Sequence, residues 1–321
     1  MHTALTTLLN IEHPIIQAGT GGGANPALAS AVSNAGALGS LSSIAMPPDM
    51  VRQAIAETRS LTDRPFAVNI VTWAFTSNWQ DIIETVIEER PPVVTISFGD
   101  PIPACERCKA AGLQTILQVQ DTAGLKAAIA ARPDAIIVQG NEAGGHTGRR
   151  STLSFATQAL DLAGDIPIVI AGGIATGRGL AAALAMGAAG VVMGTRFKAT
   201  LEFGGQPLHK DLIVASDGSN TLYDEINDLA RGGLWPNNVT GRALRNSFTA
   251  EWEGRRDELA ATVTAETPRG FFTSHMSAPE QQLNWAGEIS GVITEVLPAA
   301  EVVTRTVAEA TRLIQQLSSN G

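Results

Sequence analysis

Apolar residues along the chain fall into short runs that alternate with longer stretches of mixed polarity. Within stretches such as NPALASAVSNA, PDMVRQAIAETRS and GLAAALAMGA, apolar residues return every three or four positions, as on one face of a helix. The short runs are apolar along their whole length, which is typical of strands in a parallel sheet covered by helices. Eight such runs occur, at 14–18, 36–41, 66–71, 93–98, 114–119, 135–140, 166–171 and 190–194.

The number of repeats decides between two α/β architectures. Eight strand–helix units in about 200 residues predict a closed TIM (β/α)8 barrel, whereas a doubly wound open sheet would need fewer strands. We therefore expect residues 1–205 to form the barrel core. The pattern then breaks, and residues 206–296 are predicted to be a mostly helical or loop insertion after strand eight, without clear strand alternation and with one helix at 247–262. Residues 297–321 read as an amphipathic C-terminal helix that completes the barrel.

Composition and charge narrow the possible partners. The chain has 321 residues, is 44% apolar and carries a formal net charge of -9, which disfavours a nucleic-acid surface. No run is long enough to span a membrane, and the start, MHTALTTLLN, lacks the features of a signal peptide, so we expect a cytoplasmic protein. Cys105 and Cys108 form CERC without a second ligand pair, so we expect no metal site and interpret them as ordinary reduced thiols.

Glycine-rich turns follow several of the predicted strands. Function in such barrels gathers at the carboxyl ends of the strands, and phosphate is often bound after strands seven and eight. Gly172 and Gly173 follow the seventh run, and Gly194 and Thr195 follow the eighth, so their backbone N–H groups are candidates for a phosphate site. GTGGGA at 19–24 also fits a loose dinucleotide pattern, but the acidic residue that such a fold needs about 20 positions later is missing.

His146 stands alone among glycines on the loop after the sixth run. The other four histidines lie before the first strand or in the insertion. Imidazole is neutral near pH 7 and can accept a proton, so His146 is the candidate general base, with hydrogen bonding to a substrate oxygen as the alternative. Arg149 and Arg150 either attract an anionic substrate or are solvated surface residues.

These residues carry a resemblance to a known family. QGNEAGGHTG, VIAGGIATGRGLAAALAMGAAGVVMGTRF, FAVNI and the opening PIIQAG and NPALASAVSNAGALGSL resemble the nitronate monooxygenases, formerly called 2-nitropropane dioxygenases. The resemblance implies a TIM barrel with non-covalent FMN that oxidises alkyl nitronates, and in some cases nitroalkanes, with dioxygen to a carbonyl product and nitrite. It implies that His146 is catalytic and that the flavin contacts Ala18, Gly19, Thr20, Asn69, Gln118, Gly140, Gly145, Gly172, Gly173, Gly194 and Thr195.

The chain departs from the family pattern on the substrate side. Gly19 and Thr20 replace a common Pro-Met pair, and Thr147 stands where relatives often have arginine. FMN-dependent, NAD(P)H-using reductases of the enoyl-acyl-carrier-protein or quinone type share a similar EAGGH loop and remain the alternative; a barrel that binds a phosphorylated ligand without chemistry is a third. Trp285 is either a lid over the site or packing for the insertion. The expected partners are a small-molecule substrate and dioxygen, and the sequence leaves open whether the chain forms a homodimer.

Overall fold

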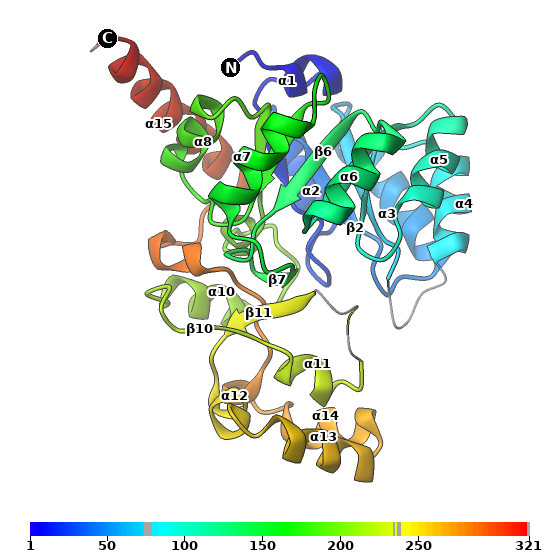
Figure 1. Ribbon diagram of the computed structural model, residues 1–321, viewed down its shortest axis with the longest axis vertical. Helices are drawn as coiled ribbons and strands as arrows, with labels where there is room; N and C mark the ends of the chain where they lie inside the picture. The colour runs from blue at the N-terminus through cyan, green and yellow to red at the C-terminus, as the bar shows by residue number, and fades with distance from the viewer. Residues whose placement is uncertain (74–78, 234, 236–238, 320–321) are drawn as a thin grey trace.

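The barrel-forming sheet is closed and parallel. A computed structural model describes residues 1–73, 79–233, 235 and 239–319 (Figure 1). Eight strands pair in parallel in the order β1-β9-β8-β6-β5-β4-β3-β2, and a bridge between Ile16 and Leu38 joins the first strand to the segment entering the second. The predicted TIM barrel is therefore confirmed. Its strands are β1 (Ile15–Gln17), β2 (Gly39–Ser42), β3 (Phe66–Val71), β4 (Val93–Ser97), β5 (Gln114–Val119), β6 (Ala135–Gln139), β8 (Ile168–Ala171) and β9 (Gly190–Met193).

Each strand is apolar throughout because both of its faces are buried. Alternate residues point to the barrel interior, where Ile16, Ala67 and Ile116 belong to one core cluster. Their neighbours point outward and join the larger cluster beneath the helices, as Ile15 and Val68 do. The interior cluster also includes Leu5 and Leu9 of α1 (Ala4–Leu9), a helix that precedes the first strand and packs against the barrel interior.

Helices alternate with the strands and cover the outside of the barrel. They are α2 (Pro26–Asn34), α3 (Pro48–Leu61), α4 (Trp79–Glu89), α5 (Ile102–Ala110), α6 (Thr122–Ala131), α7 (Thr152–Leu162), α8 (Gly177–Ala185) and the short α9 (Thr195–Lys198). The C-terminal helix α15 (Ala299–Ser319) packs against α8 and α2. Glu309 of α15 accepts a hydrogen bond of 2.8 Å from the Gly177 amide, so the last helix also caps the first turn of α8.

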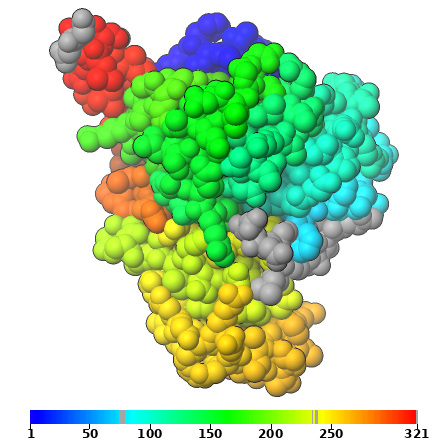
Figure 2. Space-filling model, viewed as in Figure 1, coloured from blue at the N-terminus to red at the C-terminus, as the bar shows by residue number. Residues whose placement is uncertain are grey.

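The segment between α9 and α15 forms a second lobe below the barrel (Figures 1 and 2). It contains two strands that the sequence pattern did not predict, β10 (Thr221–Asp224) and β11 (Thr240–Leu244). Both join β7 (Gly145–Thr147), from the loop after β6, in an antiparallel sheet of order β10-β11-β7. The remaining elements are α10 (Pro207–Val214), α11 (Ile226–Ala230), α12 (Ser247–Trp252), α13 (Arg256–Ala265), α14 (Pro268–His275) and the 3-10 helices η1 (Pro279–Gln281) and η2 (Glu288–Val292).

The fold corrects one further expectation and describes the surroundings of the two cysteines. The helix predicted at 247–262 is divided into α12 and α13, because Gly254 between them has a φ of +79° that a continuous right-handed helix does not allow. Cys105 and Cys108 are free and fully buried on α5, and burial raises the pKa of the Cys108 thiol to about 12. Both thiols therefore stay protonated and serve as packing groups. Within the described residues, no helix has the length and apolar character needed to cross a bilayer.

Candidate active site

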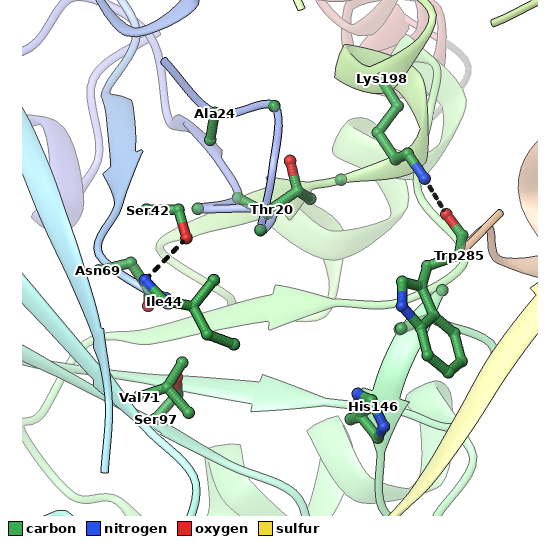
Figure 3. A pocket seen from close by; sticks show the side chains of 18 of the residues that line it. Thr20, Ala24, Ser42, Ile44, Asn69, Val71, Ser97, His146, Lys198 and Trp285 are labelled. Carbon is green, nitrogen blue, oxygen red and sulfur yellow. Dashed lines mark hydrogen bonds between the residues drawn. The ribbon is translucent and has the colours of Figure 1, made fainter. Parts of the chain in front are cut away.

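A cavity of about 790 Å³ opens at the carboxyl ends of the barrel strands, where the second lobe meets the barrel (Figure 3). The ends of β3 and β5 and the loops after β1, β2, β4, β6, β8 and β9 contribute to its wall. Eleven of the predicted site residues line it: Ala18, Gly19, Thr20, Asn69, Gln118, Gly145, His146, Gly172, Gly173, Gly194 and Thr195. The barrel topology therefore brings together residues that lie up to about 180 positions apart in the sequence.

Gly140 is the predicted site residue that does not line the cavity. A Cβ atom at this position would lie 2.1 Å from Thr152 Oγ1 and 2.4 Å from Thr152 Cα, at the start of α7. Its carbonyl accepts a hydrogen bond of 3.0 Å from Thr147 Oγ1. Gly140 is thus needed for close packing between the end of β6 and the next helix, and its predicted contact with the flavin stays a prediction.

One wall of the cavity is made of backbone amides. Gly172 and Gly173 follow β8 with φ values of +102° and +71°, a conformation that favours glycine. Gly194 precedes α9 one unit later, and a Cβ added there would meet only Ala18 and Thr20, at ordinary contact distances. The amides of these three glycines donate no hydrogen bond within the described part of the chain. Unpaired N–H groups beside a cavity are suited to an anion such as a phosphate.

The barrel side of the cavity is polar where the strands end. Gln118 Nε2 donates to Gln139 Oε1 at 3.0 Å, and Asn69 Oδ1 accepts from Thr95 Oγ1 at 3.0 Å. Gly19 lies directly against Asn69, since a Cβ atom on Gly19 would come within 2.4 Å of Asn69 Cβ. The glycine at position 19 thus lets the first loop approach the end of β3 closely.

His146 is held by a carboxylate from the second lobe. It lies on β7, and its Nε2 is 2.8 Å and 2.9 Å from the two carboxylate oxygens of Asp228 on α11. The side chains are 10% and 3% exposed, respectively, so the pair is nearly removed from water. An ionised carboxylate can only accept hydrogen bonds, so Nε2 carries the proton in the neutral ring and Nδ1 is left as the basic nitrogen. Nδ1 makes no hydrogen bond among the described residues.

Two tryptophans of the second lobe enclose the histidine. The Trp235 ring stacks on His146 with centroids 3.9 Å apart and planes 21° apart, and Trp285 lies 4.7 Å away at 54°. Phe98, after β4, meets Trp235 edge-on at 4.8 Å. The Trp285 ring also packs on Gly241, where a Cβ would come within 2.3 Å of it. Trp285 therefore lines the cavity and packs between β11 and His146 of β7, in keeping with a packing role, and its role as a lid stays a prediction.

The loop that carries His146 is fixed by polar groups of the second lobe. Tyr223 of β10 donates to the carbonyls of Thr147 and Gly148 at 3.1 and 2.8 Å. Arg242 of β11 donates from Nε to the Asn141 carbonyl at 2.9 Å. These bonds supplement the β7–β11 pairing, in which His146 faces Gly241. The second lobe therefore positions the candidate base.

The cations beside the cavity differ from those that the sequence suggested. Arg149 and Arg150 do not line it, and Arg150 instead donates to Thr122 Oγ1 and Gln158 Oε1 at 2.8 and 2.9 Å. Lys198 at the end of α9 and Arg231 after α11 line the cavity. Neither they nor Asp228 were singled out in the sequence, although the position of Lys198 four residues after the eighth strand is a signal that places it near the barrel mouth.

Comparison with known proteins assigns the family. The nitronate monooxygenase family model matches residues 2–78 and 71–309. The chain is 31% identical to a nitronate monooxygenase of Paraburkholderia phytofirmans, over 98% of this chain and 96% of the relative. It is 44% identical over 202 residues to a 5-hydroxy-7a-methyl-1-oxo-octahydro-1H-indene-4-carboxyl-CoA dehydrogenase of Rhodococcus jostii, an alignment that covers 63% of this chain and 56% of that protein.

Two solved structures share the fold of this chain over nearly its whole length. FabK from Thermotoga maritima superposes with a TM-score of 0.86 at 34% identity, covering all of both chains. A nitroalkane oxidase from Streptomyces ansochromogenes superposes with a TM-score of 0.82 at 28% identity, covering 98% of this chain and all of that one. The chain is thus an oxidoreductase of the nitronate monooxygenase family, whose members are flavoproteins.

Proposed function

We propose that this protein uses FMN and dioxygen to oxidise alkyl nitronates, and nitroalkanes after deprotonation, to a carbonyl product and nitrite. The observation that carries the proposal is the buried pair of His146 and Asp228, which presents one basic ring nitrogen beside a cavity with an anion-binding wall. The match to the nitronate monooxygenase family and the likeness to a nitroalkane oxidase structure support it.

The residues present fit FMN. The amides of Gly172, Gly173 and Gly194, which donate to no other described residue, are suited to its phosphate. Asn69 and Gln118 offer polar groups to the edge of its ring. When bound, the flavin supplies the redox chemistry, in which the substrate loses electrons that finally reduce dioxygen.

The protein's own contribution is proton transfer and positioning. With a neutral nitroalkane, Nδ1 of His146 takes the proton from the α-carbon, while Asp228 accepts the Nε2 hydrogen bond and stabilises the imidazolium that forms. A preformed nitronate has already lost this proton, so with it His146 serves only to orient the anion. Trp235 and Trp285 cover the imidazole and limit the access of water to the transferred proton.

A second candidate function is supported by the 44% identity to a carboxyl-CoA dehydrogenase and by the likeness to FabK. On this alternative, the same cavity serves a flavin-dependent NAD(P)H reductase or a dehydrogenase of an acyl thioester. His146 would then exchange a proton with a carbon or oxygen of that substrate. The two candidates differ in whether NAD(P)H reduces the flavin.

The proposal is tested by the visible spectrum and by oxygen uptake. We expect a flavin spectrum, oxygen consumption with 2-nitropropane and its nitronate, and no bleaching of the flavin on anaerobic mixing with NADH or NADPH. Rapid bleaching, without oxygen uptake on nitronate, would replace the proposal with the second candidate.

The role of the base is tested by His146→Asn, with His2→Asn as a control at an exposed position near the N-terminus. General-base catalysis contributes about 10²- to 10⁴-fold, so His146→Asn should lose that factor with 2-nitropropane and far less with the nitronate. Equal losses with both substrates would remove the general-base assignment.

A further inference from the structure

Lys198 is a buried amine with no acidic side chain beside it among the described residues. It ends α9 and lines the cavity, yet only 8% of its surface is exposed. Among the described residues, no carboxylate lies within 4 Å of its Nζ. Glu142, another residue of the cavity wall, instead accepts a hydrogen bond of 3.0 Å from the Thr152 amide at the start of α7. Burying a charge without a counter-ion costs free energy, so the presence of a lysine at this buried position requires an explanation.

Two acceptors hold the ammonium group of Lys198 in place, but they do not use all three of its N–H donors. Nζ donates to Asn284 Oδ1 at 2.9 Å and to the Trp285 carbonyl, and it lies 5.9 Å from the centre of the Phe203 ring. An ammonium group has three N–H donors, so one remains for a further acceptor. In Figure 3, Trp285 lies between Lys198 and His146, with its carbonyl toward the lysine.

From this arrangement we propose that Lys198 is an anion-binding residue of the cavity and holds an anionic oxygen of a bound ligand. Two ligands offer this chemistry: the phosphate of FMN and the anionic group of a nitronate. Lys198 follows the Gly194–Thr195 turn by one helical turn, which brings its backbone close to the proposed phosphate wall. The nitronate source rests on the proposed function, whereas the phosphate source rests only on the family being one of flavoproteins.

The electrostatics of the ligand-free protein agree with this role. Burial lowers the pKa of Lys198 to about 7, because the charged form loses its hydration and gains no acidic partner. An anion entering the cavity would supply that partner and restore the charged form. Anion binding near neutral pH is therefore coupled to proton uptake by the lysine.

The test compares Lys198→Met with the wild type in two binding assays. Apoprotein is titrated with FMN and with riboflavin, which lacks the phosphate, and flavin-loaded protein is titrated anaerobically with propyl-2-nitronate. Loss of one charge-assisted hydrogen bond should weaken the affected ligand by about 10- to 100-fold. Lys198→Arg, which keeps the charge, should recover most of that affinity if it folds; Lys210→Met is the control, since Lys210 lies on α10, donates to the Leu201 carbonyl and does not line the cavity.

Two results support the proposal and identify the ligand. Weaker FMN binding with unchanged riboflavin binding assigns Lys198 to the phosphate, and weaker nitronate binding with unchanged flavin binding assigns it to the substrate. Unchanged binding of all three ligands overturns the proposal, as does an equal loss for FMN and riboflavin, which would mean a packing defect. If the wild type itself fails to bind nitronate, the proposed function fails, and the two flavin titrations alone decide the role of Lys198.

Discussion

Replacement of Asp228 by asparagine separates the positioning of His146 from the presence of the base. Asparagine keeps the size of the side chain but can present its NH2 group to Nε2, which then has to accept. The imidazole proton moves to Nδ1, the nitrogen that should receive the substrate proton. The two bonds of 2.8 and 2.9 Å are buried and charge-assisted, a class worth about 1.5–3 kcal/mol. At 1.36 kcal/mol per factor of ten, kcat/KM for a nitroalkane should fall about 10- to 150-fold.

The assay is oxygen uptake with 2-nitropropane and with its preformed nitronate, measured for Asp228→Asn and for Asp211→Asn. Asp211 is an exposed residue of α10 in the same lobe and serves as the matched control. We expect the nitronate rate to stay within about threefold of the wild type, because no carbon-bound proton is removed from it. If Asp228→Asn turned over 2-nitropropane at the wild-type rate, the argument that this carboxylate sets the imidazole tautomer would be refuted.

Three further outcomes follow from the described geometry. Gly173→Ala should reduce the flavin content of the purified protein, because the substitution strains a φ of +71° and places a methyl group against Glu142. The control is Gly187→Ala, at a φ of +97° in open space: it should lower the free energy of unfolding by about 1 kcal/mol through the same backbone strain, but the protein should keep its flavin. The folded-state pKa of Lys198, about 7, lies below its unfolded value, so the unfolded state binds more protons between these two pKa values. The stability of the ligand-free protein should therefore rise from pH 7 to 10 relative to that of Lys198→Met, as measured by thermal unfolding. His209 also affects the pH dependence of stability, because burial and the nearby Lys198 lower its pKa. Repeating the comparison of Lys198 with Lys198→Met in a His209→Asn background measures how much of that pH dependence comes from His209. Trp285→Ala should speed loss of the substrate proton to water, measured as faster washout of deuterium from 2-deutero-2-nitropropane.

The barrel could be predicted because each of its strand–helix units is recognisable from residues that are neighbours in the sequence. Each strand is apolar on both faces, as the alternation of Ile15 and Ile16 between two core clusters illustrates, and each is followed by a helix with its own periodicity. The carboxyl ends of parallel strands meet at one edge, so the positions of His146, Gly173 and Gly194 in the chain were enough to place them at one cavity.

The second lobe could not be predicted in the same way. β10 and β11 have only four and five residues, and β11 pairs with β7, which lies nearly 100 positions away in the sequence. No local alternation therefore identifies these two strands. Asp228 lies 82 residues from His146, in a segment that also contains Asp224 and Glu225, and nothing in its spacing distinguishes it from them. In the sequence, Lys198 resembles the polar end of a short surface helix. Only the structure shows that Asn284 and Trp285, which are distant in the sequence, accept hydrogen bonds from it.

The packing of α15 against α2 and α8 has a consequence for synthesis of the chain. The ribosome completes β9 roughly a hundred residues before it reaches Ala299, which at about 5–20 residues per second is a delay of roughly 5–20 s. Throughout that interval the faces of α2 and α8 that α15 will cover are open to solvent on a nascent polypeptide whose barrel strands are already complete. Chaperone demand during translation should therefore be greatest in this window, and slow codons in the second lobe would prolong it.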